Sequence, residues 1–165
     1  MNLNLAFYKL FNGLGFGQFG NKIRLFFLKK IAKKIGDNVY IAKNVTIIHP
    51  ENISLGNNVS IHQWCYLDCS GGLEIGNDVS IAHACSIMTF NHTYTDPIVP
   101  IRNQPLEYSP VIIKDNVWLG CRVTILPGVV IKSRTVIGAG AVVNKSFENE
   151  NLIVGGVPAK VLKNI

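Results

Sequence analysis

Aliphatic residues recur at every sixth position through the second half of the chain. The residues that open these six-residue units are Ile113, Leu119, Ile125, Ile131 and Ile137. The fifth place of each unit holds a small side chain, in order Val117, Val123, Val129, Thr135 and Ala141. A period of six fits neither an α-helix nor a simply alternating strand. It predicts short strands joined by regular corners, which is the pattern of a parallel β-helix.

The same period is present in the first half of the chain. It forms three groups, opened by Ile35, Ile41 and Ile47, by Leu55, Ile61 and Leu67, and by Ile75, Ile81 and Ile87. Corresponding members of successive groups lie 20 residues apart. Each coil is therefore expected to have three faces, with about two residues added at one corner, and the next coil to stack on it. We predict an all-β prism over residues 35–146.

Asparagine and glycine occupy repeated places between the expected strands. Asparagine precedes valine at Asn38, Asn44, Asn58 and Asn116. Glycine follows the opening aliphatic residue at Gly36, Gly56, Gly76, Gly120 and Gly138. Asparagine tolerates the left-handed backbone of a tight corner, and glycine fits where a corner leaves no space for a Cβ. Local chemistry and the global period therefore predict the same fold.

The period fails between residues 88 and 112, a segment that contains four prolines. A long excursion from a regular solenoid is a preferred place for function, so we predict a protruding loop here. His92 lies where this loop leaves the scaffold and is a candidate general base. Asp68 lies on the coil before the interruption. Its side chain could form a turn hydrogen bond or take part in the functional site, and both interpretations stay open.

The net charge of +6 is confined to one end of the chain. Residues 1–36 contain seven basic residues and no acid, whereas the remainder carries nine basic and ten acidic residues. The charge is thus no argument that the prism binds nucleic acid. Residues 1–34 form a basic amphipathic N-terminal segment, with a helix expected over 21–34. We expect it to cap the open end of the solenoid, with contact to a membrane surface as the second interpretation.

The first 20 residues are apolar, but Lys9 interrupts the run and no small-residue cleavage site follows. Neither a signal peptide nor a transmembrane helix is expected. Cys65 and Cys85 are 20 residues apart and should stack in the core as reduced thiols of a cytoplasmic protein. A zinc site would instead combine His62, Cys65, Cys69 and His83, but this spacing fits no familiar cluster. No metal is expected.

Several short motifs resemble those of the hexapeptide-repeat acyltransferases, which form left-handed parallel β-helices and act as trimers. The motifs are Asn91-His92, residues 116–120 (NVWLG), 125–128 (ILPG), 137–140 (IGAG), 142–145 (VVNK) and 155–160 (GGVPAK). The resemblance covers residues 35–165 and is closest to the maltose and galactoside acetyltransferases and the O-acetyltransferases of surface polysaccharides. It implies a left-handed β-helix with an N-terminal helical cap and one protruding loop. Pro158 further predicts a short helix within residues 147–165.

The resemblance also implies roles for individual residues. His92 matches the family's catalytic base. The residues that would line a coenzyme A groove between subunits are Trp118, Cys121, Ala139, Asn144, Lys145, Lys160 and Lys163. Cys121 stands where a serine is common and Asn144 where a threonine is common. We expect acceptor contacts from Asp68, Asn91, Tyr94 and Arg102.

The implied function is transfer of the acetyl group of acetyl-CoA to a hydroxyl of a sugar or glycan precursor. The expected partners are two further copies in a homotrimer and a small-molecule or lipid-linked glycan acceptor. The localisation would be cytoplasmic, with the inner face of the membrane as an option for the basic segment. Three alternatives stay open: an acetyltransferase for serine or a drug-like alcohol, a zinc-dependent carbonic-anhydrase-like β-helix, and a non-catalytic scaffold. Neither the acceptor nor the choice between O- and N-acetylation can be read from the sequence.

Overall fold

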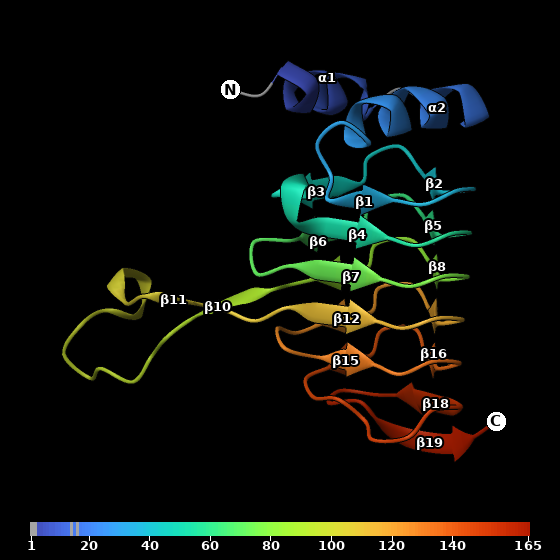
Figure 1. Ribbon diagram of the computed structural model, residues 1–165. Helices are drawn as coiled ribbons and strands as arrows, with labels where there is room; N and C mark the ends of the chain where they lie inside the picture. Colours follow the sequence, from blue (N-terminus) through green and yellow to red (C-terminus); the bar gives the residue numbers. More distant parts are fainter. Residues whose placement is uncertain (1–2, 14, 16) are drawn as a thin grey trace.

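The computed structural model describes residues 3–13, 15 and 17–165. Short strands stack into a triangular prism, two helices lie across one end of it, and a hairpin stands off its side (Figure 1). The helices are α1 (Leu3–Phe11) and α2 (Gly17–Leu28). Two short 3₁₀ turns interrupt the coils, η1 (Pro50–Asn52) and η2 (Ile101–Asn103).

Three sheets form the faces of the prism. The first face contains β1 (Lys34–Ile35), β4 (Ile53–Leu55), β7 (Leu73–Ile75), β12 (Val111–Ile113) and β15 (Val130–Ile131). The second face contains β2 (Tyr40–Ile41), β5 (Ser60–Ile61), β8 (Ser80–Ile81), β13 (Trp118–Leu119), β16 (Val136–Ile137), β18 (Leu152–Gly155) and β19 (Lys160–Asn164). The third face contains β3 (Thr46–Ile48), β6 (Tyr66–Asp68), β9 (Ser86–Ile87), β14 (Thr124–Ile125) and β17 (Val142–Val143).

The register of these sheets confirms the period read from the sequence. Along the second face, parallel pairing stacks Ile41, Ile61, Ile81, Leu119 and Ile137 one above the other. Each of these side chains is fully buried, so the aliphatic residue that opens each unit points into the prism. The outward neighbours differ from coil to coil, because only the inward position must be apolar.

The corners also have the predicted chemistry. All four predicted asparagines have positive φ, from 52° at Asn38 to 59° at Asn44. A Cβ on Gly36 would lie 2.5 Å from the carbonyl oxygen of Gly56, so this corner requires glycine. Between the first and second faces, side-chain oxygens of Asn57 and Asn77 accept backbone N–H groups of the coil before, at 2.8 and 2.9 Å. Hydrogen bonds thus link successive coils at the corners as well as along the strands.

Both ends of the chain differ from the prediction. The helix expected over 21–34 begins at Gly17 and ends at Leu28, and residues 3–11 form a second helix. The short C-terminal helix is wrong: β19 pairs antiparallel with β18 and completes the second face. The free edge of β18 offers backbone hydrogen bonds to the last residues, whereas a five-residue helix would lack most of its own. Within the described residues, no helix is long and apolar enough to cross a membrane.

Candidate functional site

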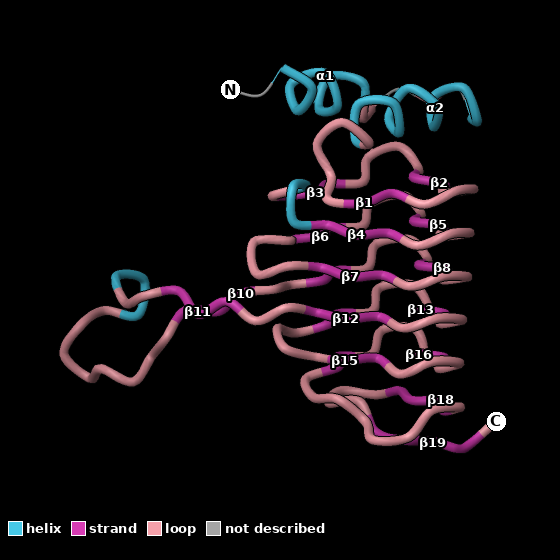
Figure 2. The backbone as a smooth tube through the Cα atoms, viewed as in Figure 1, coloured by secondary structure: helices cyan, strands magenta, loops and turns pink. Residues whose placement is uncertain are grey.

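The excursion from the coils is an antiparallel hairpin. It leaves the corner between the third and first faces, after β9, and its strands are β10 (Phe90–His92) and β11 (Leu106–Tyr108). Phe90 pairs with Tyr108 and His92 with Leu106. Figure 2 shows this pair of strands carrying the loop away from the prism. The hairpin therefore positions His92 on a hydrogen-bonded ladder rather than on an irregular loop.

The tip of the hairpin is held by its own polar groups. Gln104 is almost fully buried, and its side-chain Nε2 donates to the carbonyl oxygens of Asp96 and Val99, both at 2.9 Å. The Oδ1 atom of Asp96 accepts the backbone N–H of Ile98 at 2.8 Å. These bonds replace the aliphatic packing that the coils use, and so the loop keeps one shape without a hydrophobic core.

His92 is exposed on the side of the hairpin. Beyond it, the backbone N–H and the hydroxyl of Thr93 both donate to the carbonyl oxygen of Pro105, at 2.9 and 3.0 Å. Three other predicted contacts, Asn91, Tyr94 and Arg102, are also exposed on the same excursion. The excursion thus exposes an imidazole, an amide, a phenol and a guanidinium, of which His92 and its strand neighbour Asn91 point to opposite faces of the hairpin.

Asp68 is buried, unlike the four exposed residues of the hairpin. Its side chain is only 3% exposed, and its Oδ1 accepts the backbone N–H of Ser70 at 2.9 Å. The hydroxyl of Thr89 donates to the carbonyl oxygen of Asp68 at 2.9 Å and accepts the N–H of Gly71 at 2.8 Å. Asp68 and Thr89 therefore hold the corner from which the hairpin departs. This geometry favours the turn hydrogen bond over contact with an acceptor.

Three of the predicted coenzyme residues lie on the second face or beside it. Trp118 opens β13 and is 55% exposed on the outside of the prism. Cys121 and Ala139 occupy the next corner, between the second and third faces, in adjacent coils. The N–H of Gly140 donates to the carbonyl oxygen of Cys121 at 2.9 Å, which stacks these two corners directly. Together they form a strip that runs along the prism axis.

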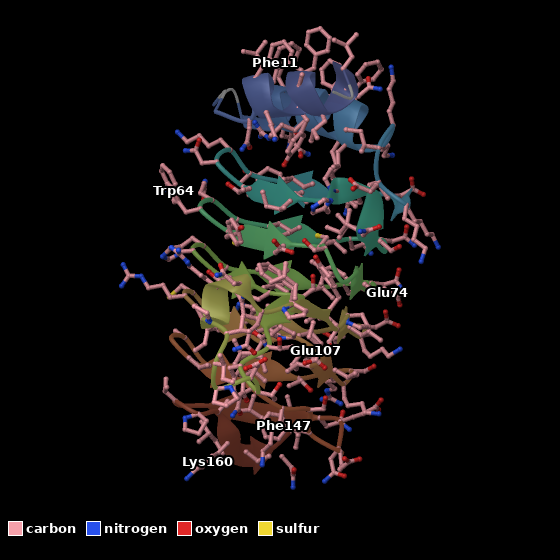
Figure 3. All side chains as sticks on the ribbon, turned by 90° about the vertical axis from the view of Figure 1, so that its left-hand side faces the viewer. Phe11, Trp64, Glu74, Glu107, Phe147 and Lys160 are labelled. Carbon is pink, nitrogen blue, oxygen red and sulfur yellow. The ribbon has the colours of Figure 1, made fainter. Side chains whose placement is uncertain are left out.

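A cavity of about 550 Å³ opens at the C-terminal end of the prism. Its lining residues are Lys145, Ser146, Phe147, Glu148, Ala159, Lys160 and Val161. The cavity brings together two of the predicted lysines, and Figure 3 shows Phe147 and Lys160 at this end. Asn144 precedes Lys145 and is exposed, and Lys163 lies further along β19. Two cations beside apolar surface from Phe147 and Val161 suit a ligand that carries both phosphate and a flat ring.

A single chain does not bring the predicted residues into one place. His92 lies at the corner between the third and first faces, whereas Cys121 and Ala139 lie at the corner between the second and third. Trp64 marks the corner between the second and third faces, and Glu107 marks the hairpin. Figure 3 shows Trp64 at the side of the prism, away from Glu107. The width of the third face separates the two corners. A complete site for these residues would need a second copy of the chain.

The cysteines belong to the core and not to a metal cluster. Cys65, Cys69 and Cys85 are buried, and Cys121 is half-buried. A hydrogen bond between the Cys65 and Cys85 thiols lowers the pKa of Cys65 and raises that of Cys85. His62 packs against the ring of Tyr40, with 5.9 Å between centroids. Among residues 3–13, 15 and 17–165, no group of three or more His, Cys, Asp and Glu side chains could hold a metal ion.

Comparisons with known proteins place this fold among transferases. Residues 110–145 match the family model of the bacterial transferase hexapeptide (six repeats). The chain is 36% identical over 118 residues to a putative lipopolysaccharide biosynthesis O-acetyl transferase of Escherichia coli, covering 67% of this chain and 60% of the relative. The first three curated relatives that it matches are longer, and it spans 60%, 44% and 66% of their lengths.

Two solved structures extend the comparison to the whole architecture. A maltose O-acetyltransferase from Clostridium difficile superposes with a TM-score of 0.85 and 32% identity, covering 98% of this chain and 84% of that one. A mutant N-acyltransferase from Bacillus cereus, in complex with dTDP-4-amino-4,6-dideoxyglucose and coenzyme A, gives a TM-score of 0.65 and 27% identity, covering 83% and 86%. Because its repeat register, its hairpin and these similarities all agree, the chain belongs to the hexapeptide-repeat acyltransferase family.

Proposed function

We propose that this protein transfers the acetyl group of acetyl-CoA to a hydroxyl group of a sugar or glycan precursor, with His92 as the general base. The observation that carries the proposal is the hairpin, which is the only long excursion in residues 35–146. It holds the exposed imidazole of His92 on a hydrogen-bonded ladder. The relatives support the reaction, because their names describe O-acetyl transfer to sugars and transfer in lipopolysaccharide biosynthesis. The acceptor of this chain is inferred from that class.

The chemistry needs few groups. The acceptor oxygen attacks the thioester carbonyl while the imidazole of His92 takes its proton, which is worth on the order of 10²–10⁴ in rate. A backbone N–H of the glycine-containing coils would donate to the oxyanion of the tetrahedral intermediate. Collapse of this intermediate breaks the carbon–sulfur bond, and the imidazolium returns the proton to the leaving coenzyme A thiolate. Both substrates are bound at once, and no acyl-enzyme forms.

The coenzyme would bind along the strip and into the cavity. Lys145 and Lys160 would attract its phosphates, and Phe147 and Val161 would contact the adenine ring. Trp118, Cys121, Ala139, Asn144 and Lys163 would line the remainder of the groove. Since His92 and this strip lie at different corners of one chain, we infer that each site forms between two copies. A closed ring of three copies would complete three such sites.

Coenzyme binding and turnover test the proposal separately. Coenzyme A release would be followed chromatographically across free sugars, nucleotide sugars, amino sugars, serine and simple alcohols. Lys145→Ala and Lys160→Ala should each weaken coenzyme A binding in calorimetry, whereas Lys114→Ala, an exposed lysine at another corner, should not. If the wild type neither binds coenzyme A nor consumes acetyl-CoA with any acceptor, the proposal fails.

Mixing two inactive variants tests whether the site is shared. His92→Asn chains keep the strip and cavity, and chains with Lys145→Ala and Lys160→Ala keep the base. Dissociation and reassembly of the mixture should restore a fraction of the activity, because some interfaces then combine an intact base with an intact coenzyme groove. No recovery from a mixture that reassembles to the wild-type size would place the whole site in one chain.

A further inference from the structure

The helices that cover the first coil pack Leu25 and Leu28 against the core and also contact the coil through polar groups. The hydroxyl of Tyr8 donates to the carbonyl oxygen of Val45 at 3.2 Å, and Arg24 Nε to that of Ile41 at 3.0 Å. Asn21 donates to the carbonyl oxygen of Val39 at 3.1 Å. The first coil has no preceding coil, so its backbone carbonyls need these donors. Burial raises the pKa of Tyr8 and lowers that of Arg24, which fits side chains enclosed between helix and coil.

The opposite face of the same helices is apolar. Leu3, Leu10 and Phe19 are 66–69% exposed, and Phe26 is 56% exposed. Figure 3 shows the aromatic side chains around Phe11 pointing away from the prism at its free end.

Three further phenylalanines tie the two helices together on this side. The ring of Phe27 stacks on that of Phe7 at 5.2 Å and on that of Phe11 at 5.7 Å. A terminal cap normally keeps a polar outer face, whereas this cap exposes several large apolar side chains on that side. We call the side formed by Leu3, Phe7, Leu10, Phe11, Phe19, Phe26 and Phe27 the outer face of the cap.

Lysines surround this apolar surface. Five exposed lysines, Lys9, Lys22, Lys29, Lys30 and Lys33, lie on the two helices or directly after α2. The Nζ atom of Lys30 lies 4.1 Å from the centre of the Phe26 ring, so charge and apolar surface are in contact. Residues 1–36 contain no acidic residue, while the remainder of the chain has a net charge of −1. The cap therefore combines exposed apolar side chains with the positive charge of the chain.

We propose that the outer face of the cap binds the surface of an anionic lipid bilayer. The aromatic and aliphatic side chains would enter the boundary between headgroups and acyl chains, and the lysines would bind the anionic headgroups. Helices of nine and twelve residues suit a position in the plane of the interface and are too short to span it. A second copy of the cap is the less suitable partner, because its own seven cations would repel these.

Membrane binding by the cap would also define the class of acceptor. This consequence rests on the proposed function. With the cap on the membrane, the hairpin leaves the prism after three coils, roughly 15 Å from the cap at the usual spacing between strands. A glycan precursor carried on a lipid could be presented at this height, whereas a free sugar gains nothing from the arrangement. The inferred acceptor class is therefore a lipid-linked glycan.

Vesicle flotation of the full chain tests lipid binding without coenzyme or acceptor. The wild type should float with vesicles that contain phosphatidylglycerol and much less with phosphatidylcholine alone, and added salt should weaken binding. The double variant Phe19→Ser/Phe26→Ser should lose at least tenfold in partitioning. Lys29→Gln and Lys30→Gln should each lose about fivefold. Ile98→Ser removes an even more exposed apolar residue from the hairpin and should change nothing.

Several outcomes would overturn the proposal. Wild-type chain that stays at the bottom of the gradient with anionic vesicles excludes lipid binding. If the phenylalanine variants instead change the oligomeric mass in light scattering, a second copy covers the outer face. Equal binding by wild type and phenylalanine variants, with unchanged circular dichroism, would exclude this face as the contact. Lipid binding without any acetyl transfer would leave the membrane contact standing and remove the inferred acceptor class.

Discussion

Two adjacent isoleucines of β12 offer a direct test of the coil register. Ile113 points into the prism between Ile75 and Ile131 and is 1% exposed, whereas Ile112 lies on the outside of the first face and is half-buried. Ile113→Ala removes three carbons from the core and leaves a cavity, which costs about 2–5 kcal/mol. Ile112→Ala removes the same atoms from the surface and should cost about 1 kcal/mol or less.

Thermal and urea unfolding would measure the difference. For a domain of this size, Ile113→Ala should lower the melting temperature by about 5–15 °C and Ile112→Ala by only a few degrees. Melting at two protein concentrations separates any contribution from contacts between copies. Equal losses from both variants, independent of concentration, would refute the inward and outward assignment of this strand.

Other predictions concern the corners and the thiols. Gly56→Ala places a Cβ 2.6 Å from the backbone of the next coil and should destabilise the fold by about 1–3 kcal/mol in urea unfolding; an unchanged midpoint would contradict this crowding. Ala84 has a φ of 60°, so Ala84→Asn should stabilise by up to about 1 kcal/mol, and a loss would count against the corner assignment. In the folded protein, Cys121 should react with a thiol reagent first, and faster labelling of the buried cysteines would contradict the packing. Burial raises the pKa of Cys69, so its contribution to stability is complete below the ordinary thiol pKa of 9.0 and is lost as pH rises above it; Cys69→Ala should flatten the alkaline fall in stability by at most about 1.4 kcal/mol per pH unit.

The prism could be predicted because its rules are local and repeated. An inward aliphatic residue every six positions fixes the register, and one column such as Ile41, Ile61 and Ile81 already defines a 20-residue coil. The asparagines and glycines added an independent signal, since each marks a corner by its own backbone preference. The pattern therefore predicted strands, faces and stacking together.

The hairpin and the C-terminus are held by interactions that leave no repeating pattern in the sequence. Gln104 looks like an ordinary polar loop residue in the sequence, and only the folded loop shows its amide enclosed by Asp96 and Val99. The last strand forms because β18 has a free edge, which is a property of the assembled prism and not of residues 160–164. The ends of the N-terminal helices shifted for a similar reason, since Asn21 and Arg24 are fixed by carbonyls of the first coil.

The sequence predicted individual residues of the candidate site but not how these residues lie relative to one another. The motifs predict Lys145 and Lys160 as coenzyme contacts, but only the folded chain shows Phe147 and Val161 lining the same cavity. For Asp68 both a turn hydrogen bond and an acceptor contact were open, and its bond to Ser70 favours the turn. In the proposed function, His92 meets the coenzyme groove of another copy, and the pattern of one chain cannot show such a meeting.

Acetyl transfer by His92→Asn tests the central claim most directly. The measurement is the rate at which labelled acetyl moves from acetyl-CoA to the best glycan acceptor, with coenzyme A binding measured on the same samples. His49→Asn is the matched control, because His49 is an exposed histidine two coils before the hairpin, and its positive φ of 53° suits asparagine. We expect His92→Asn to bind coenzyme A as the wild type does and to transfer acetyl about 10²–10⁴ times more slowly, while the control is unchanged. A His92→Asn variant that transfers acetyl at the wild-type rate would contradict this expectation.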